Sequence, residues 1–351
     1  MPGLSIIGTG RFLPGRPYTN HDLARVMDTN DEWIRQRTGI AQRHFCPPGQ
    51  GAADLALPAC QQALEAARLA PADIDYILFN TMTPDNLFPG PGALLGARLG
   101  CTGVPALDLR TQCAAMLFAF QVAESLLNSG AARRILIVGA EAHAALMPFD
   151  WEVLDGKREG KPTDAAFALA TQHRGWAVIF GDGAGALVVE RAERPDAGIV
   201  AIDLHSDGRY ANELCIPAGF RRPTDASAPD PAFFDAVRIQ MNGRDVFKHA
   251  VTKLPRSVAD VCEKARVRVS DIDWFVAHQA NQRINESVCE RLGVPPEKMP
   301  SNIDRCGNTS AATIPLLLDE MQRDGRLRPG QLVCFLALGA GFHWGSALVR
   351  W

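Results

Sequence analysis

Short apolar runs alternate along the chain with longer stretches that carry charges at helical spacing, a pattern typical of strands alternating with helices. Two of these runs, residues 73–80 (DIDYILFN) and 271–278 (DIDWFVAH), are near copies of each other. A helix-like stretch precedes each copy, QQALEAARLA in the first case and ADVCEKARVRV in the second. The alternation of strands and helices predicts parallel α/β sheets. The repeated segment predicts two equivalent units around a pseudo-twofold axis.

The copy continues beyond these strands. Cys113 opens an apolar helical pattern that ends at Gly130, and Asn308 opens a second one that ends at Gly325, 17 positions further on in both cases. Glycine in that place is typical of a helix C-cap. A buried strand and then a glycine-rich turn into another strand follow each helix. The two halves therefore pair Cys113 with Asn308.

This pairing predicts a shared site. His278 ends the second copied strand, where the first copy has Asn80. A pseudo-twofold axis brings the starts of equivalent helices close together. We therefore expect Cys113, His278 and Asn308 to lie in one cleft, although they are far apart in the sequence.

Composition and charge narrow the class of protein. The chain has 351 residues, 47% of them hydrophobic, so it can bury a large core. Its formal net charge of -3 gives no general attraction to nucleic acid or to an anionic membrane, and neither is an expected partner. The N-terminal residues do not resemble a signal peptide, and no apolar stretch reaches the roughly 18 residues of a membrane span. These features predict a cytoplasmic protein.

The nine cysteines are scattered, without CxxC or Cys/His pairs at zinc spacing. Neither a disulfide framework nor a metal site is expected from them. Residues 193–198 (ERPDAG) are the only plausible junction, so the halves are predicted to span residues 1–195 and 196–351. Residues 142–173 form a long irregular segment of the kind that serves as a lid or as an interface element.

Each of the three polar residues also has a plain structural interpretation. Cys113 at a helix start would have a lowered thiol pKa and a nucleophilic thiolate, but a cysteine among apolar residues is more often an inert core thiol. His278 is equally compatible with a structural role at a strand end. Asn308 alone would be read as a helix N-cap.

Six motifs favour the catalytic interpretation. In order along the chain they are DTNDEWIRQRTGI, the Cys113 segment, FGDGAGA, FVAHQANQRI, DRCGNTSAATIP and GAGFHWGSALVRW. At these spacings the chain resembles the 3-oxoacyl-[acyl-carrier-protein] synthase III family of the thiolase superfamily over nearly its whole length. The resemblance implies a duplicated, layered αβαβα fold with mixed five-stranded sheets and a Cys–His–Asn catalytic site.

The resemblance also implies a reaction. Cys113 would take an acyl group from acyl-CoA or from an acyl carrier protein, with backbone N–H groups of Cys113 and Ala340 holding the oxyanion. A malonyl thioester would then lose carbon dioxide, while His278 Nε2 and the Asn308 amide stabilise the enolate that attacks the acyl group. The product is a 3-oxoacyl thioester. Coenzyme A or phosphopantetheine thioesters are substrates here, and no tightly bound cofactor is expected.

Further residues acquire expected roles only through the resemblance. Trp33, Arg37 and Arg174 match contacts to coenzyme A, and Asn281 matches a contact to pantetheine. Lys248, Arg283 and Arg291 match basic positions that face the acyl carrier protein. Phe88, Ala115 and Leu338 are assigned to the acyl pocket, with Phe88 reaching across a homodimer.

Three departures from the family pattern concern the substrate. Ala115 and Ala340 stand at positions where the family usually has glycine, two residues after the nucleophile and at the centre of the oxyanion turn. Segment 142–173 is also longer than the family pattern leads us to expect. They favour a specialised enzyme of secondary metabolism that takes unusual or longer acyl chains. The alternatives are a related acyltransferase, a ketosynthase that joins chains without decarboxylation, and a non-catalytic partner subunit, which retention of all three polar residues disfavours.

Overall fold

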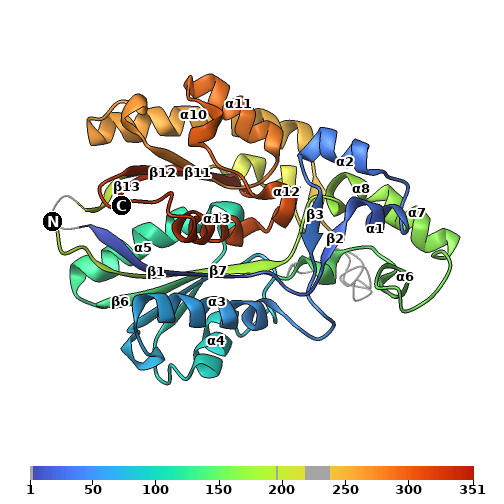
Figure 1. Ribbon diagram of the computed structural model, residues 1–351, viewed down its shortest axis with the longest axis horizontal. Helices are drawn as coiled ribbons and strands as arrows, with labels where there is room; N and C mark the ends of the chain where they lie inside the picture. Colours follow the sequence, from blue (N-terminus) through green and yellow to red (C-terminus); the bar gives the residue numbers. More distant parts are fainter. Residues whose placement is uncertain (1–2, 195–196, 218–237) are drawn as a thin grey trace, which may run out of the picture.

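The computed structural model describes residues 3–194, 197–217 and 238–351, and Figure 1 shows them as stacked layers. The first sheet has the strand order β1-β7-β6-β4-β5. Its strands are β1 (Leu4–Phe12), β4 (Tyr76–Asn80), β5 (Ala106–Leu109), β6 (Arg134–Glu141) and β7 (Gly183–Arg191). Strand β4 runs parallel to β5 and β6, whereas β7 is antiparallel to β6 and β1. The sheet is therefore mixed.

The second sheet repeats this arrangement with the order β11-β12-β13-β8. Its strands are β8 (Gly198–Ser206), β11 (Trp274–Ala277), β12 (Leu332–Gly339) and β13 (His343–Arg350). Strands β11 and β12 are parallel, and the other two pairs are antiparallel. The expected mixed α/β fold is confirmed, but within the described residues the second sheet has four strands and not five. Where the first half has β5, the second half has the short helix α12 (Ile303–Cys306).

Helices fill the layers between and outside the sheets (Figure 1). The central layer holds α5 (Ala115–Ser129) and α13 (Thr313–Arg323), whose apolar side chains form one core with both sheets. The outer face of the first sheet is covered by α3 (Ala52–Ala67) and α4 (Pro91–Leu99), and that of the second by α10 (Gly243–Ala265) and α11 (Gln282–Leu292). Burial of both faces explains why the strands read as continuous apolar runs.

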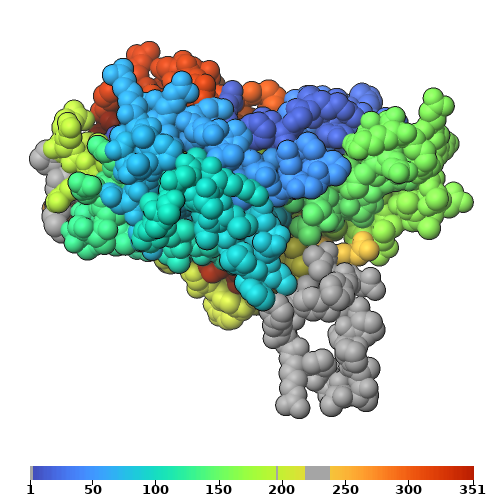
Figure 2. All heavy atoms as spheres, turned by 90° about the horizontal axis from the view of Figure 1, so that it is seen from below, coloured from blue at the N-terminus to red at the C-terminus, as the bar shows by residue number. Residues whose placement is uncertain are grey.

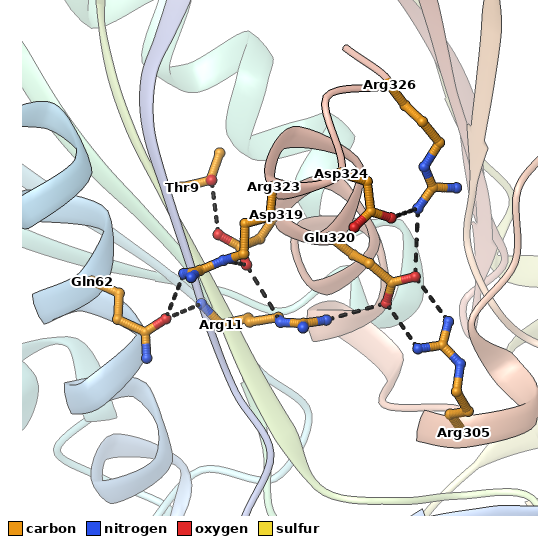
Figure 3. Close-up of polar contacts among 9 residues, drawn as sticks. All are labelled: Thr9, Arg11, Gln62, Arg305, Asp319, Glu320, Arg323, Asp324 and Arg326. Carbon is orange, nitrogen blue, oxygen red and sulfur yellow. Dashed lines mark hydrogen bonds and ion pairs between the residues drawn. The ribbon is translucent and has the colours of Figure 1, made fainter.

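Charged side chains join α13 to the first half (Figure 3). Asp319 accepts hydrogen bonds from Thr9 of β1 at 2.8 Å and from Arg323 at 2.6 Å. Glu320 is bound by Arg305 at 2.8 Å and by Arg11 of β1 at 3.1 Å. Because both carboxylates are largely buried, these partners offset the cost of removing them from water.

Segment 142–173 packs at one end of the molecule (Figures 1 and 2). It contains the 3-10 turn η3 (His143–Leu146), α6 (Trp151–Leu154) and α7 (Asp164–Gln172), and α8 (Arg174–Ala177) follows it. Its apolar residues share a core with the N-terminal segment that carries β2 (Pro17–Thr19), α1 (Asn20–Ala24), α2 (Asp31–Thr38) and β3 (Gln42–His44). The Trp151 ring lies 5.2 Å from that of Phe45. The segment is thus a packed layer of this chain.

The remaining elements are short. They are the strands β9 (Leu214–Cys215) and β10 (Gln240–Met241) and the 3-10 turns η1 (Pro71–Asp73), η2 (Gln112–Ala114), η4 (Gly208–Glu213), η5 (Val269–Asp271), η6 (Pro296–Lys298) and η7 (Ser310–Ala312). The predicted boundary at residues 195 and 196 lies outside the described residues, so the domain limits stay a prediction. None of the described helices is both long enough and apolar enough to cross a membrane.

Candidate active site

Cys113, His278 and Asn308 line one cavity of about 420 Å³. They come from three places: turn η2 in front of α5, the end of β11, and the chain just before turn η7. Their side chains are almost sealed from solvent, with exposed fractions of 6%, 5% and 5%. The expectation that these three residues meet in one cleft is therefore met by the geometry.

The two halves correspond in a register that differs from the predicted one. Turns η2 and η7 have the same backbone: each begins with a left-handed residue, Gln112 at φ 47° and Ser310 at φ 45°. These two residues lie 198 positions apart, and the starts of β4 and β11 and of β6 and β12 have the same separation. With this register Cys113 corresponds to Ala311. The predicted pairing of Cys113 with Asn308 is wrong by three residues.

The helix ends explain the error. Gly130 is the left-handed C-cap of α5, as predicted. Helix α13 instead ends at Arg323 with Asp324 as its C-cap, so Gly325 lies one residue beyond. The equal spacing to a glycine is therefore a coincidence of two helices that differ in length.

The Cys113 thiol is protonated at neutral pH, contrary to the sequence prediction. Burial raises its pKa to about 12, because a thiolate loses its hydration inside the protein. A hydrogen-bond contact of 3.3 Å between Cys113 Sγ and Ser310 Oγ lowers the pKa, and the negative charge of Glu141 raises it. The loss of hydration is the largest of these effects.

His278 is a neutral imidazole held at one nitrogen. Its Nδ1 lies 2.7 Å from Thr313 Oγ1, and its backbone N–H donates to the Leu336 carbonyl at 2.9 Å. Burial lowers the pKa of His278 to about 3. Its Nε2 has no hydrogen-bond partner among the described residues and is left to serve the cavity.

Asn308 is held by both its backbone and its side chain. Its N–H donates to the Ile179 carbonyl at 3.0 Å, and its own carbonyl accepts from the Gly181 N–H at 3.1 Å. Its Oδ1 accepts from the Ser310 N–H at 2.8 Å. This bond orients the amide, so that Nδ2 is the end left to donate to a ligand.

The two expected oxyanion donors flank the nucleophile. Within the described part of the chain, nothing accepts a hydrogen bond from the N–H of Cys113 or of Ala340. Gly339 packs against the nucleophile turn, and a Cβ added there would lie 2.9 Å from Cys113 N. Ala340 and Cys113 also line a second cavity of about 240 Å³, bounded further by Met82 and Ile239.

The residues assigned to the acyl pocket are placed differently from one another. Ala115 is fully buried and lines neither cavity, and Leu338 lines the larger cavity but not the second one. Phe88 is 79% exposed on its loop and lines neither cavity of this chain. Segment 142–173 contributes nothing to either cavity, so it is not a lid over them.

The residues expected to contact coenzyme A cluster on the surface. The Trp33 ring stacks with the guanidinium groups of Arg37 at 4.4 Å and Arg174 at 5.1 Å. The Asn281 side chain donates to the Arg37 carbonyl at 2.9 Å and accepts from the Arg283 N–H at 2.9 Å, while it also lines the larger cavity. The cluster is thereby tied to the cavity entrance.

Of the three predicted basic docking residues, Arg283 lines the larger cavity and is exposed. Lys248 on α10 and Arg291 at the end of α11 are exposed but do not line it. Sequence analysis missed Arg244, which also lines the cavity. The signal was present, because Arg244 precedes Lys248 by four residues and so lies on the same helix face.

A buried carboxylate beside the site was also missed. Glu141 ends β6 and accepts hydrogen bonds from the N–H groups of Met82 at 3.1 Å and Ala311 at 3.3 Å, and from the Thr83 hydroxyl at 2.7 Å. Burial raises its pKa to about 7. Ser310 and Thr313 were missed as well, because a hydroxyl in a helix start carries no distinctive sequence signal.

One group of side chains has the ligand types of a metal site. Ligand atoms of Asp203, His205 and Asp260 lie within 4.8 Å of one another. However, Lys264 Nζ already lies 2.6 Å from Asp203 Oδ1, and Ser257 donates to the same carboxylate. Asp260 in turn pairs with Arg256 at 3.8 Å. Both carboxylates thus have a cation of the protein as partner, and we assign no metal to the group.

Two duplicated sheets around a buried cysteine, a neutral histidine and an amide donor define an acyltransferase of the condensing type. Comparison with known proteins gives the same class. Residues 107–208 match the family described as 3-oxoacyl-[acyl-carrier-protein (ACP)] synthase III, and residues 262–351 match its C-terminal part. The chain belongs to this family.

Similarity extends over the full length. The chain is 41% identical to a beta-ketoacyl-[acyl-carrier-protein] synthase III from Erythrobacter litoralis, over 99% of each chain. The crystal structure of the 3-oxoacyl-[acyl-carrier-protein] synthase III from Aquifex aeolicus is 35% identical with a TM-score of 0.85, over 99% of this chain and all of that one. A priming beta-ketosynthase from the R1128 polyketide pathway is 28% identical with a TM-score of 0.83, over 99% and 97%.

Proposed function

We propose that this chain loads an acyl group onto Cys113 and condenses it with a malonyl thioester, releasing carbon dioxide and a 3-oxoacyl thioester. The observation that carries the proposal is the shared cavity of Cys113, His278 and Asn308. Family membership supports the reaction class, and the geometry supports the residue roles.

In the first half-reaction the sulfur of Cys113 attacks the thioester carbonyl. The tetrahedral oxyanion is held by the N–H groups of Cys113 and Ala340, neither of which has an acceptor among the described residues. Because the resting thiol is protonated, its S–H bond breaks as the sulfur attacks, and the proton ends on the sulfur of the departing coenzyme A or carrier-protein arm.

In the second half-reaction a malonyl thioester occupies the larger cavity. Loss of carbon dioxide leaves an enolate whose oxygen accepts hydrogen bonds from Asn308 Nδ2 and from the Nε2–H of neutral His278. The enolate carbon attacks the acyl group on Cys113 and expels the sulfur. An amide does not exchange protons at neutral pH, so the role of Asn308 is electrostatic.

Both thioesters arrive on a phosphopantetheine arm, as part of coenzyme A or of an acyl carrier protein. Trp33, Arg37 and Arg174 are the proposed coenzyme A contacts, and Arg244, Lys248, Arg283 and Arg291 are the proposed docking residues for the acidic carrier protein. Such charges chiefly raise the association rate and act less at high salt. The cavity of about 240 Å³ beyond Cys113 is the proposed acyl pocket.

Several finer points complete the proposal. We propose a homodimer in which Phe88 serves the partner, a cytoplasmic location, and no tightly bound cofactor. We also propose that the enzyme belongs to a specialised pathway with unusual or longer acyl chains. That last point fails if acetyl-CoA with malonyl carrier protein is by far the best substrate pair.

The decisive experiment is intact-protein mass spectrometry after incubation with a panel of acyl-CoA thioesters. Wild type should gain the mass of one acyl group, and Cys113→Ala should gain none. Absence of any adduct, or an equal adduct on Cys113→Ala, would overturn the proposal. Addition of the malonyl thioester should then release carbon dioxide, whereas an ester-forming acyltransferase or a non-decarboxylative ketosynthase would release none.

A further inference from the structure

The proposed acyl pocket has polar side chains in a largely apolar wall. This cavity of about 240 Å³ is lined by Cys113 and by apolar residues such as Met82 and Ile239. Arg110 and Gln112, which lie three residues and one residue before Cys113, line it as well. A plain aliphatic chain needs neither a cation nor an amide beside it. These two side chains therefore bear on which acyl group the pocket takes.

Arg110 is a cation without a counter-ion in the described part of the chain. Its guanidinium forms no ion pair and no hydrogen bond with any described residue. The acid nearest to it in the sequence, Asp108, instead accepts a hydrogen bond from the Gly92 N–H at 2.9 Å. The described residues that line the cavity include no Asp or Glu. Because Arg110 is exposed and lines the cavity, its charge is available to a group bound there.

The Gln112 side chain supplies a second unpaired polar group. Its amide forms no hydrogen bond with another described residue, and its Oε1 is buried. The imidazole that also lines the cavity is already held, since His343 Nδ1 lies 2.7 Å from Ser206 Oγ. An aliphatic chain that filled the cavity would displace water from the Gln112 amide and return no hydrogen bond, which is unfavourable. An acyl group with a hydrogen-bonding end avoids that cost.

We propose that this pocket selects an acyl group with a terminal carboxylate, which pairs with Arg110 and accepts a hydrogen bond from Gln112 Nε2. The acyl donor is thus a thioester of a short dicarboxylic acid. This inference rests on the proposed function and narrows it. At about 240 Å³ the cavity is smaller than the roughly 300–1,000 Å³ of pockets for drug-sized ligands, which fits a short chain. The unusual feature of the substrate is then its charge and not its length.

The chemistry of the two side chains fits a carboxylate. A guanidinium presents planar N–H groups that match both carboxylate oxygens, and a carboxylate without such a partner would be costly to move into an apolar cavity. The remote carboxylate takes no part in the bond changes. The bond from the acyl carbon to the coenzyme A sulfur breaks, the bond to Cys113 Sγ forms, and the Cys113 proton ends on the coenzyme A sulfur. The carboxylate keeps its charge and appears in the 3-oxoacyl product.

The first test compares thioesters of equal shape in wild type, scored by kcat/KM for acylation of Cys113. Succinyl-CoA is paired with 4-methylpentanoyl-CoA, and glutaryl-CoA with 5-methylhexanoyl-CoA, because an isopropyl end has the shape of a carboxylate without its charge. Wild type should prefer the carboxylated member of at least one pair by about tenfold or more. Equal values, or a preference for the neutral member, in both pairs would overturn the inference.

The second test changes the cation. Arg110→Gln removes the charge, so the ratio of kcat/KM for the carboxylated and the neutral thioester should fall from about ten to about one. Arg110→Lys keeps a charge without the planar fork and should retain part of the preference. The matched control is Arg133→Gln, because the Arg133 side chain is 90% exposed and lines neither cavity. This control should keep the full wild-type preference.

A contact between subunits is the competing use of Arg110. If its guanidinium paired with a carboxylate of a second copy of the chain, Arg110→Gln would elute later in size-exclusion chromatography and would keep the preference for the carboxylated thioester. An unchanged preference overturns the inference whatever the elution, and loss of the preference at the wild-type elution supports it. Failure of the proposed function is separate, because wild type would then gain no acyl mass from any thioester, charged or neutral.

Discussion

The two turns η2 and η7 have the same backbone and opposite surroundings. In η7 the N–H of Ala311 is bound by the carboxylate of Glu141 at 3.3 Å. In η2 the N–H of Cys113, the equivalent residue, faces Gly339 and has no acceptor in the part of the chain that the structure describes. Glu141 and Gly339 are themselves equivalent, since they end the equivalent strands β6 and β12. The backbone N–H in η7 is therefore taken by a carboxylate, whereas the backbone N–H in η2 is free to bind an oxyanion.

The difference teaches how a duplicated fold yields a single reaction centre. Both helix starts offer backbone donors near one cavity, yet only the turn with a thiol faces a position without a side chain. The acid at the other turn serves structure, because it satisfies N–H groups from both halves of the chain. The predictions below test this contrast, from the largest expected effect to the smallest.

Filling the open turn should be the most harmful change. A Cβ at Gly339 would lie 2.9 Å from Cys113 N and 3.0 Å from Ala114 N, so Gly339→Ala must displace the nucleophile turn. We expect acylation to slow about 10²-fold or more through loss of the oxyanion donor. The acylation rate of Cys113 can be measured by stopped-flow or by quenching the reaction at set times. Gly175→Ala, where an added Cβ meets nothing within 4 Å, should keep the wild-type rate, and equal rates in both variants would contradict the comparison.

Removing the acid from the other turn should cost stability. Glu141→Ala leaves the N–H groups of Met82, Thr83 and Ala311 without their acceptor in a buried region. The free energy of unfolding should fall by about 3 kcal/mol in urea titration. Glu152→Ala, which removes an exposed carboxylate, should cost less than about 0.5 kcal/mol. A loss below about 1 kcal/mol for Glu141→Ala would mean that the carboxylate does not stabilise turn η7.

The shared backbone strain predicts a smaller effect of opposite sign. Gln112 sits at φ 47°, a conformation that favours glycine, and its buried Oε1 lacks a partner among the described residues. Gln112→Gly should therefore raise the free energy of unfolding by about 0.5 kcal/mol. Gln36→Gly, in the ordinary helical backbone of α2, should lower it by about 1 kcal/mol. Destabilisation in both variants would show that the turn is unstrained.

The last prediction is an absence of change. Burial lowers the pKa of His278 to about 3, so the imidazole remains neutral as the pH falls from 8 to 5. An ordinary histidine would gain a proton near pH 6.5 in this range. The ring nitrogen-15 signals of His278 should stay constant from pH 8 to pH 5. A midpoint between pH 6 and 7 would contradict burial of the ring.

Much of the fold was predictable because strands buried on both faces leave long apolar runs and because the halves retain copied segments. The meeting of Cys113, His278 and Asn308 was also predictable. The pairing of Cys113 with Asn308 was not correct, since the glycine spacing used as a landmark depends on helix length and not on turn register. The thiol pKa was predicted in the wrong direction because burial depends on atoms that arrive from both sheets.

The sequence by itself determined the duplicated α/β plan, the family resemblance and the three polar residues of the cavity, because these follow from local patterns and motifs. Only the tertiary structure decided which residues contact one another: Thr313 contacts His278, Ser310 contacts Cys113, and Glu141 contacts Ala311. Such contacts depend on how two layers meet, and a hydroxyl or a glycine has no sequence pattern that shows what lies opposite it. The protonation state of the site was decided there too, since it is set chiefly by burial.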